Sequence, residues 1–302
     1  MLITNKISNS GDPSLDIQKF NRLKPTILCC RYWWFEIWKG QQMSFPFWRL
    51  YWNKNTGAYI VYKKKIFLVP NQIYLIPPHT SYSTGIIDQK QIPKSDYFFK
   101  CSRIESKQDE KIQMERQNIL HFFLHFTLGT DYDNIEPGVY SFDLNSDHQK
   151  MLTQIIESLL ENPKEFSLNT SFTIYSLILT AVNKITPEIK PSKVLHDKTY
   201  LAIDFIDKNL GNKITDTIIA DVLGVSSTFL YNLFKKDMRL SPSKYVAKIR
   251  IEKAGNLLLY SDYSIEKIAG LCGFSDRYHL TKIFKKVKGT PPAAFRKTYG
   301  YF

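Results

Sequence analysis

The chain has 302 residues and a formal net charge of +13, with 43% hydrophobic and 23% charged residues. This composition indicates a folded, soluble protein rather than a disordered chain, and the length favours two domains. No apolar run reaches the ~18 residues of a membrane span, and residues 1–15 lack the apolar core of a secretory signal. The four cysteines include no C-x-x-C pair. We therefore expect reduced thiols in a cytoplasmic protein with no membrane partner.

From Tyr32 to about Leu144, short runs of aromatic and β-branched residues alternate with turn residues. Strands this short and this regularly spaced predict an antiparallel sandwich or barrel, and Pro77-Pro78 would end a strand at its rim. The polar stretch 101–117 is expected to be a surface loop. The expected strands include Trp48–Trp52, Ala58–Tyr62, Ile66–Val69, Ile73–Ile76, Leu120–Leu128 and Val139–Leu144.

A small barrel lined by Trp and Tyr could hold one small ligand, and aromatic faces suit sugars. The alternative is that these aromatic residues are simply core. His121 and His125 match the H-x-x-x-H spacing of helical zinc sites, and His79 could be a third ligand. On a strand, however, positions i and i+4 lie about 13 Å apart, which is too far for one ion. No metal site is predicted.

Two helices are predicted in the middle of the chain, at residues 147–160 and 168–185, from apolar spacings of three and four. In the second, Leu168, Phe172, Tyr175, Leu179 and Val182 form a heptad-like seam of barely two heptads. The seam fits a helix packed on its own barrel and the contact of a two-helix dimer equally well. Residues 186–193 contain two prolines and are predicted to be the domain linker.

The last third contains an internal repeat, in which residues 215–236 and 264–286 match at an offset of 49 to 50 residues. Each copy begins with a Thr or Ser suited to capping a helix. Each also has a glycine, Gly224 or Gly273, where a turn needs positive φ. This is the pattern of two helix-turn-helix units. The segment between them, residues 243–259, predicts a helix about 25 Å long. Its expected apolar face is Val246, Ile249, Ala254 and Leu257.

The second helix of each unit is predicted to have an apolar inner face and a polar outer stripe. The inner faces are Leu230, Leu233 and Phe234 in the first unit, and Leu280, Ile283, Phe284 and Val287 in the second. The outer stripes are Thr228, Tyr231, Asn232 and Lys235, and, 50 residues later, Tyr278, Thr281, Lys282 and Lys285. Such stripes fit two consecutive major grooves, about 34 Å apart, where Asn and Thr read base edges and Lys meets guanine or phosphate.

The distribution of charge along the chain supports the same interpretation. Residues 191–302 hold 19 Lys/Arg against 10 Asp/Glu, whereas the preceding 190 residues hold 22 against 18. A basic C-terminal third suits a polyanionic partner, although a lysine-rich solvated surface explains the charge equally well on its own.

These residues resemble the AraC/XylS family of bacterial transcription regulators. The closest match comprises Ser264–Asp276, Ile283–Lys286, Gly289–Pro292 and Phe295-Arg296, and the resemblance covers about residues 197–296. The first half resembles the family's cupin-like effector domain through Tyr74–Pro78, His121–Phe126 and the two helices that follow. Two positions depart from the family pattern. Arg239 stands where a glycine usually ends the first recognition helix, and Gly255 lies inside the helix between the units.

The resemblance implies an α+β multidomain protein. A β-rich cupin-like barrel with a two-helix dimerisation segment would occupy residues 20–186, and an all-α double helix-turn-helix domain residues 194–300. The implied partners are double-stranded promoter DNA, a small effector such as a sugar, a second copy of the chain and RNA polymerase, with no cofactor. Whether the dimer forms through residues 147–185, and whether the protein activates or represses, stays open.

The candidate DNA-binding residues are Ser227, Thr228, Tyr231, Asn232, Lys235, Arg277, Tyr278, Thr281, Lys282 and Lys285. The candidate effector-binding residues are His121, Phe123, Tyr82 and Trp52. The metal-binding histidines of enzymatic cupins have no counterpart and no acid–base pair stands out, so no enzyme is predicted. Two alternatives remain, a cupin-type enzyme fused to a DNA-binding module and a DNA-binding protein whose barrel serves only dimerisation.

Overall fold

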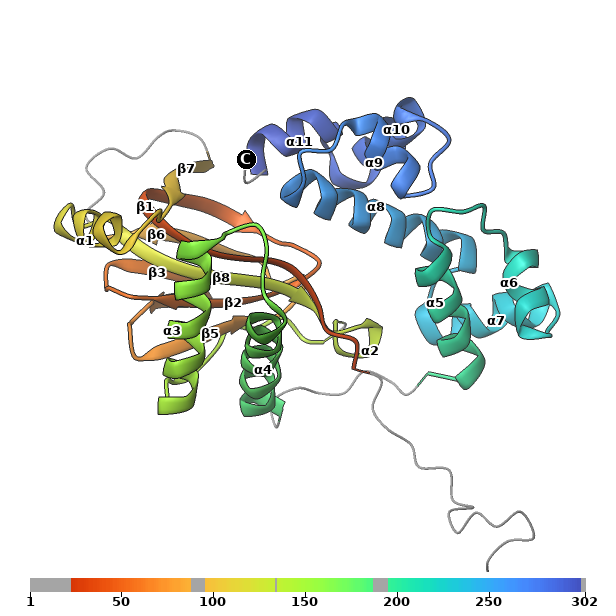
Figure 1. The fold of residues 1–302 in the computed structure, drawn as a ribbon. Helices are drawn as coiled ribbons and strands as arrows, with labels where there is room; N and C mark the ends of the chain where they lie inside the picture. The colour runs from red at the N-terminus through yellow and green to blue at the C-terminus, as the bar shows by residue number, and fades with distance from the viewer. Residues whose placement is uncertain (1–22, 88–95, 134, 187–194, 300–302) are drawn as a thin grey trace, which may run out of the picture.

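The computed structural model describes residues 23–87, 96–133, 135–186 and 195–299. A curled, strand-rich N-terminal region is followed by a helical C-terminal region (Figure 1). The expected linker at 186–193, except Thr186, lies outside the described residues. So do the bounds 20, 194 and 300 of the two expected domains.

The strands form one antiparallel nine-stranded sheet in the order β4-β3-β6-β1-β8-β2-β5-β9, with β7 also paired to β1. The first half of the 18-residue β1 pairs with β8, and its second half pairs with β6 and β7. The strands are β1 Thr26–Met43, β2 Trp48–Asn53, β3 Ala58–Tyr62, β4 Lys64–Phe67, β5 Gln72–Ile76, β6 Tyr82–Ile86, β7 Tyr97–Arg103, β8 Ile119–Thr127 and β9 Tyr140–Asp143. The six strands expected from the sequence are confirmed within two residues at each end, and β5 ends directly before Pro77.

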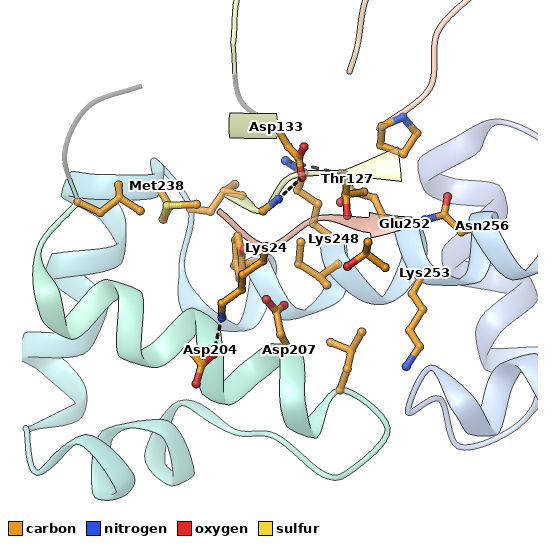
Figure 2. Close-up of a pocket in the computed structure, with 18 of the residues that line it drawn as sticks. Lys24, Thr127, Asp133, Asp204, Asp207, Met238, Lys248, Glu252, Lys253 and Asn256 are labelled. Atoms are coloured by element: carbon orange, nitrogen blue, oxygen red, sulfur yellow. Dashed lines mark hydrogen bonds and ion pairs between the residues drawn. The ribbon is translucent and has the colours of Figure 1, made fainter. Parts of the chain in front are cut away.

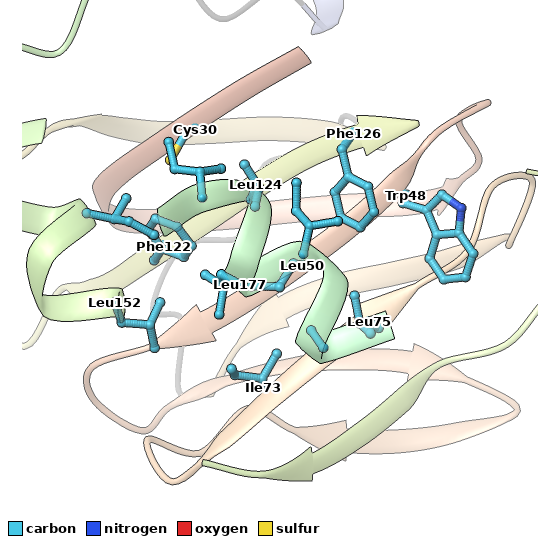
Figure 3. Packing of buried hydrophobic residues seen from close by; sticks show 14 of the residues in the cluster. Cys30, Trp48, Leu50, Ile73, Leu75, Phe122, Leu124, Phe126, Leu152 and Leu177 are labelled. Atoms are coloured by element: carbon cyan, nitrogen blue, oxygen red, sulfur yellow. The ribbon is translucent and has the colours of Figure 1, made fainter. Parts of the chain in front are cut away.

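Both faces of the central strand β8 are buried. On β8, Leu120, Phe122, Leu124 and Phe126 join a cluster beneath the helices α3 and α4, shown in Figure 3, whereas Phe123 joins a second cluster on the inner face of the curl. Because successive side chains on a strand point to opposite faces, each face receives alternate residues. Burial on both faces explains why β8 reads as a nearly continuous apolar run.

The prediction of a surface loop at residues 101–117 is wrong. Residues 101–103 complete β7, and helix α1 spans Lys107–Glu115. Ser106 caps this helix by accepting a hydrogen bond from the Asp109 backbone N–H at 3.0 Å. Of the helix residues only Gln113 is buried, and it bonds the Asn118 amide. A helix that buries one polar residue carries no apolar periodicity, so its sequence reads as a loop.

Helices α3, Ser146–Glu161, and α4, Leu168–Ile185, lie along the outer face of the sheet and confirm the two expected middle helices (Figure 1). The seam expected on α4 does not pack on the barrel as a whole. Residues such as Ile174, Leu177 and Ile178 make that contact instead. Three seam residues point to solvent: the exposed fractions of Leu168, Phe172 and Leu179 are 72%, 61% and 40%.

The C-terminal region consists of helices, with the long helix α8 in the middle, α5–α7 near one end and α9–α11 near the other (Figure 1). The bounds are α5 Asp197–Asn209, α6 Asp216–Leu223, α7 Ser227–Met238, α8 Pro242–Tyr260, α9 Ile265–Leu271, α10 Arg277–Lys288 and α11 Pro292–Tyr299; the short α2, Thr130–Asp133, follows β8. No single helix in the described ranges is long and apolar enough to cross a membrane. The pair α6 and α7 meets that test together, but the two helices are bent by 98°.

Candidate nucleic-acid interface

Helices α6 and α7 form the first helix-turn-helix unit, and local hydrogen bonds fix both helix starts. Thr215 accepts a hydrogen bond from the Ile218 backbone N–H, and Ser226 accepts one from that of Phe229. Between the helices, Gly224 has a φ of 62°. The positive φ expected at this glycine is therefore confirmed, and it turns the chain sharply without the cost that a Cβ would add.

Helices α9 and α10 repeat the arrangement. Ser264 caps α9, Gly273 occupies the turn with a φ of 75°, and Asp276 caps α10 by accepting a hydrogen bond from the His279 backbone N–H at 2.7 Å. The two units differ where their second helices end. Gly289 ends α10 in the left-handed conformation, whereas Arg239 adopts that conformation at the end of α7, with a φ of 56°.

The apolar faces of α7 and α10 are buried much as predicted. Leu230, Leu233 and Phe234 are buried in the first unit, as are Leu280 and Phe284 in the second. Val287 was expected to face inward but is 57% exposed, because it lies in the last turn of α10, beyond the core of its unit.

The prediction of a single apolar face on α8 is also wrong. Val246 and Ile249 pack on the first unit, whereas Ala254 and Leu258 pack on the second. Because two separate cores use different sides of the helix, its apolar residues do not follow one stripe.

The polar stripes of α7 and α10 lie on the surface. All ten candidate DNA-binding residues are exposed except Thr281, which is partly buried; Tyr231 and Tyr278 are 44% and 71% exposed. Within the described ranges, no carboxylate forms an ion pair with Lys235, Lys282 or Lys285. The stripes therefore present hydrogen-bonding groups and positive charge to solvent.

Two cation–π contacts order these stripes. The Lys235 ammonium lies 5.7 Å from the Tyr231 ring centroid, one helical turn away. The Arg277 guanidinium lies 4.8 Å from the Tyr278 ring and donates a 2.8 Å hydrogen bond to its hydroxyl. Contacts of this kind hold long side chains beside rigid rings without removing their charge.

Three of the four candidate effector residues lie together on the inner face of the sheet. His121, Phe123 and Tyr82 are each at most 2% exposed. The centroid of the Phe123 ring lies 5.4 Å from that of His121 and 5.3 Å from that of His125. Trp52 is not with them. It follows Tyr51 on β2 and therefore points to the outer face, where it packs on the cluster beneath α3 and α4.

The inner face also contains polar groups that sequence reasoning missed. Arg49 is 3% exposed and donates a hydrogen bond to the Tyr82 hydroxyl, which lies 2.9 Å from that of Tyr51. Asn53 bonds His121 Nδ1 at 2.7 Å. A period of two along β2 brings Arg49, Tyr51 and Asn53 to one face, and this spacing was the available signal.

Burial controls the ionisation of this cluster. It lowers the pKa of His121 to about 3, and it lowers that of His125 well below its usual value with help from the Arg49 charge. Both imidazoles are therefore neutral at physiological pH. Within the described residues, no group of three or more His, Cys, Asp and Glu side chains is arranged to hold a metal ion.

The inner face of the sheet touches the helical region directly. His125 Nδ1 shares a hydrogen bond with the hydroxyl of Tyr260, the last residue of α8, and the Tyr260 ring meets Phe47 edge to face at 5.9 Å. No sequence pattern links positions 125 and 260. The contact brings the helix that joins both helix-turn-helix units against the buried imidazole.

A cavity of about 1010 Å³ lies between the two regions. Strand ends and loops of the strand-rich region line one side of it, and residues of α5, α7 and α8 line the other. In Figure 2, Lys24 reaches from the strand-rich region to Asp204 of α5, with which it forms a 2.5 Å ion pair. Burial raises the pKa of Asp133 to about 7 and that of Asp207 to about 6. This charged cavity and the Tyr260 contact form part of the interface between the two regions.

Two helix-turn-helix units on one shared helix define a double helix-turn-helix DNA-binding protein. A family model described as "Helix-turn-helix domain" matches residues 219–298. A crystal structure of an AraC-type DNA-binding domain regulator from Chromobacterium violaceum is 29% identical; the match covers 34% of this chain and 93% of that one, with a TM-score of 0.33.

The raffinose operon transcriptional regulatory protein of Pediococcus pentosaceus is 33% identical over 100 residues, which are 33% of this chain and 36% of that protein. The lactose operon transcription activator of Staphylococcus xylosus is 26% identical over 211 residues, 69% of this chain and 64% of that protein. The chain thus spans between about a third and two thirds of these relatives, which are named as regulators rather than enzymes. The helix-turn-helix domain expected from the sequence is therefore confirmed at the C-terminal end of the chain, and it is of the AraC type.

Proposed function

We propose that this protein regulates transcription by binding promoter DNA in a sequence-specific manner, with α7 and α10 in consecutive major grooves. The observation that carries the proposal is the pair of exposed polar stripes on the two helices, each backed by its own buried core. The 19 residues of α8 span about 28 Å. With the bulk of a unit at each end, that length suits grooves about 34 Å apart.

The roles of the candidate residues follow from their chemistry. Hydrogen-bonding side chains in the middle of each stripe suit base edges, and cations at the ends suit phosphates. We assign contacts with base edges to Thr228, Tyr231, Asn232, Arg277, Tyr278, Thr281 and Lys282. We assign contacts with the phosphate backbone of the DNA to Ser227, Lys235 and Lys285. A regulator of this kind would act in the cytoplasm, and, as an activator like the named Staphylococcus relative, it would contact RNA polymerase.

Binding to DNA selected by the protein from random duplexes tests this proposal. Six to ten phosphate contacts should lower affinity by about 10³–10⁵ between 50 and 200 mM salt. Lys282→Ala should cost about 1–3 kcal/mol on the selected site and relax the preference at one base pair. Lys111→Ala, which removes the same charge from exposed α1, is the control and should leave affinity unchanged. A flat salt response would refute the proposal, and equal loss on all sequences would make Lys282 a phosphate contact only.

We propose that the strand-rich region is a cupin-like effector domain whose inner face binds a small hydroxylated molecule such as a sugar. The neighbouring polar groups support this, because the buried Asn53 Nδ2 and Thr84 Oγ1 have no hydrogen-bond partner in the described structure. Buried polar atoms of this kind are stabilised by a ligand that supplies hydroxyl groups. The names of the raffinose and lactose operon relatives also favour a sugar.

Thermal unfolding with a panel of monosaccharides and oligosaccharides tests the effector. A sugar present at 100 times its Kd should add about 2.7 kcal/mol of stability. His121→Phe should abolish the gain, whereas Trp52→Phe, on the outer face, should retain it. A gain that survives His121→Phe would place the ligand elsewhere. If no sugar stabilises the protein, the barrel serves dimerisation alone.

We propose that a second copy of the chain covers the exposed α4 face formed by Leu168, Phe172 and Leu179. Three large apolar side chains on one helical stripe are unusual on a solvated surface, and pairing two such stripes would bury them. Phe172→Glu should convert a dimer to a monomer in sedimentation experiments. Thr180→Glu, exposed on the same helix about 100° from the Leu179 direction, should not. A wild-type monomer at high concentration would rule out this contact.

A further inference from the structure

The two helix-turn-helix units have separate hydrophobic cores. The first gathers around Ala220, Leu230 and Phe234, and the second around Ala269, Leu280 and Phe284. Helix α8 contributes to both. The orientation of one recognition helix relative to the other therefore depends on α8 and on contacts where the two units meet.

Arg250, in the middle of α8, occupies that meeting point. Its Nε donates a hydrogen bond to the Leu210 carbonyl at 3.2 Å, and its Nη2 donates one to the Asn212 carbonyl at 2.6 Å. These carbonyls belong to the turn that follows α5, where a helix end leaves backbone acceptors unpaired. A single guanidinium thereby fixes the α5–α6 turn of the first unit to α8.

The α9–α10 turn of the second unit lies against the same place. A Cβ on Gly273 would be 2.4 Å from the Leu210 carbonyl oxygen and 2.6 Å from Arg250 Nη2. Close by, a Cβ on Gly211 would be 3.5 Å from the Leu271 carbonyl oxygen. The turns of both units and the guanidinium of Arg250 are thus in direct contact, and Gly273 leaves no room for a side chain between them.

We propose that Arg250 is a positioning residue that sets the orientation of α7 relative to α10, and thereby the spacing of the two DNA boxes that the protein accepts. The proposal rests on the DNA-binding function proposed above. Arg250 acts through the backbone of the α5–α6 turn and the close approach of Gly273. It is absent from both polar stripes. Its loss should therefore loosen the geometry between boxes while leaving the recognition of each box intact.

The test uses the two-box site selected by the wild-type protein, with the spacer between boxes lengthened and shortened one base pair at a time, and DNA that carries one box. Wild-type affinity should peak at one spacing and fall about tenfold, equal to about 1.4 kcal/mol, at the neighbouring spacings. Arg250→Ala should bind one-box DNA within about twofold of wild type while its preference among spacings falls below about threefold. Arg250→Lys keeps the positive charge but loses the pair of donors that a guanidinium provides. Its preference among spacings should therefore lie between those of the wild type and Arg250→Ala.

Gly273→Ala and Gly224→Ala form a matched pair that keeps the test decisive. Both glycines have positive φ, but a Cβ on Gly224 meets nothing within 4 Å, whereas a Cβ on Gly273 collides with the contact. Gly273→Ala should therefore shift the preferred spacing, and Gly224→Ala should not.

Two results would overturn the inference: a spacing preference unchanged in Arg250→Ala, or an equal loss on one-box and two-box DNA, which would make Arg250 a phosphate contact. Failure of the wild-type protein to bind DNA would instead refute the proposed function.

Discussion

The contact between Tyr260 and His125 joins the two regions of the protein, and its removal has a calculable effect. His125 is fully buried and neutral, because burial and the nearby Arg49 charge lower its pKa. Tyr260→Phe deletes the hydroxyl and leaves the buried Nδ1 without that partner. A neutral hydrogen bond contributes about 0.5–1.5 kcal/mol, and an unsatisfied buried group costs about 1–3 kcal/mol. We expect a loss of about 1–3 kcal/mol, because the imidazole is fully buried.

Tryptophan fluorescence suits this measurement because of where the tryptophans lie. All five, Trp33, Trp34, Trp38, Trp48 and Trp52, are in strands β1 and β2 of the sheet. Their fluorescence therefore reports the unfolding of the strand-rich region, whereas circular dichroism at the helix band reports mainly the helical region. Tyr260→Phe should lower the urea midpoint seen by both probes and separate their transitions, because the hydroxyl stabilises the interface between the regions.

Tyr263→Phe is the matched control. Tyr263 lies three residues further along, is 36% exposed and stacks on Lys267 at 3.8 Å. Its variant should keep both transitions within about 0.5 kcal/mol of wild type, as surface substitutions usually do. The interface argument fails if Tyr260→Phe is as stable as Tyr263→Phe, or if only the helical transition moves.

Two further predictions concern stability. Histidine in the unfolded chain titrates near pH 6.5, whereas folded His121 and His125 have lowered pKa values, so the stability present above pH 6.5 is lost as the pH falls. Between pH 7.5 and 5.5, His121 contributes a loss on the order of 1 kcal/mol, and His125 a loss in the same direction. Urea unfolding at both pH values should show that His121→Gln reduces the fall by that amount, and an unchanged fall would mean that the imidazole is protonated in the folded state. Arg239→Gly should raise the free energy of unfolding by about 1 kcal/mol, because Arg239 has a φ of 56°; a lower melting temperature would show that its side chain contributes more than the backbone costs.

The double helix-turn-helix region was predictable because its signals are local. The Ser226 cap, the left-handed Gly224 and the spacing of Leu230 and Phe234 lie within one turn or one helix, and the copy 50 residues later confirms the interpretation. The same locality predicted most strands and the two middle helices. Where the local signal was weak, as in α1 with only Gln113 buried, the prediction failed.

Contacts between distant segments could not be predicted in this way. Arg49 carries a charge, and a charged residue in a sequence is expected to be exposed; its burial depends on the rings of Phe45, Phe47 and Tyr82 that the fold assembles around it. Trp52 was grouped with the inner-face aromatics by type, although its neighbour Tyr51 occupies that face. Residue type alone did not separate the two faces, whereas the alternation along β2 does.

Helix α8 is the element through which the parts of the molecule meet. Its first half packs on one helix-turn-helix unit through Val246 and its second half on the other through Leu258. Arg250 lies between these contacts, and Tyr260, at the end of the helix, reaches the inner face of the sheet. Because α8 is one continuous helix, we expect a displacement of its last residue to move the second unit relative to the sheet. Under the effector binding proposed above, a ligand on the inner face beside His125 would therefore change the placement of α10 through this one helix.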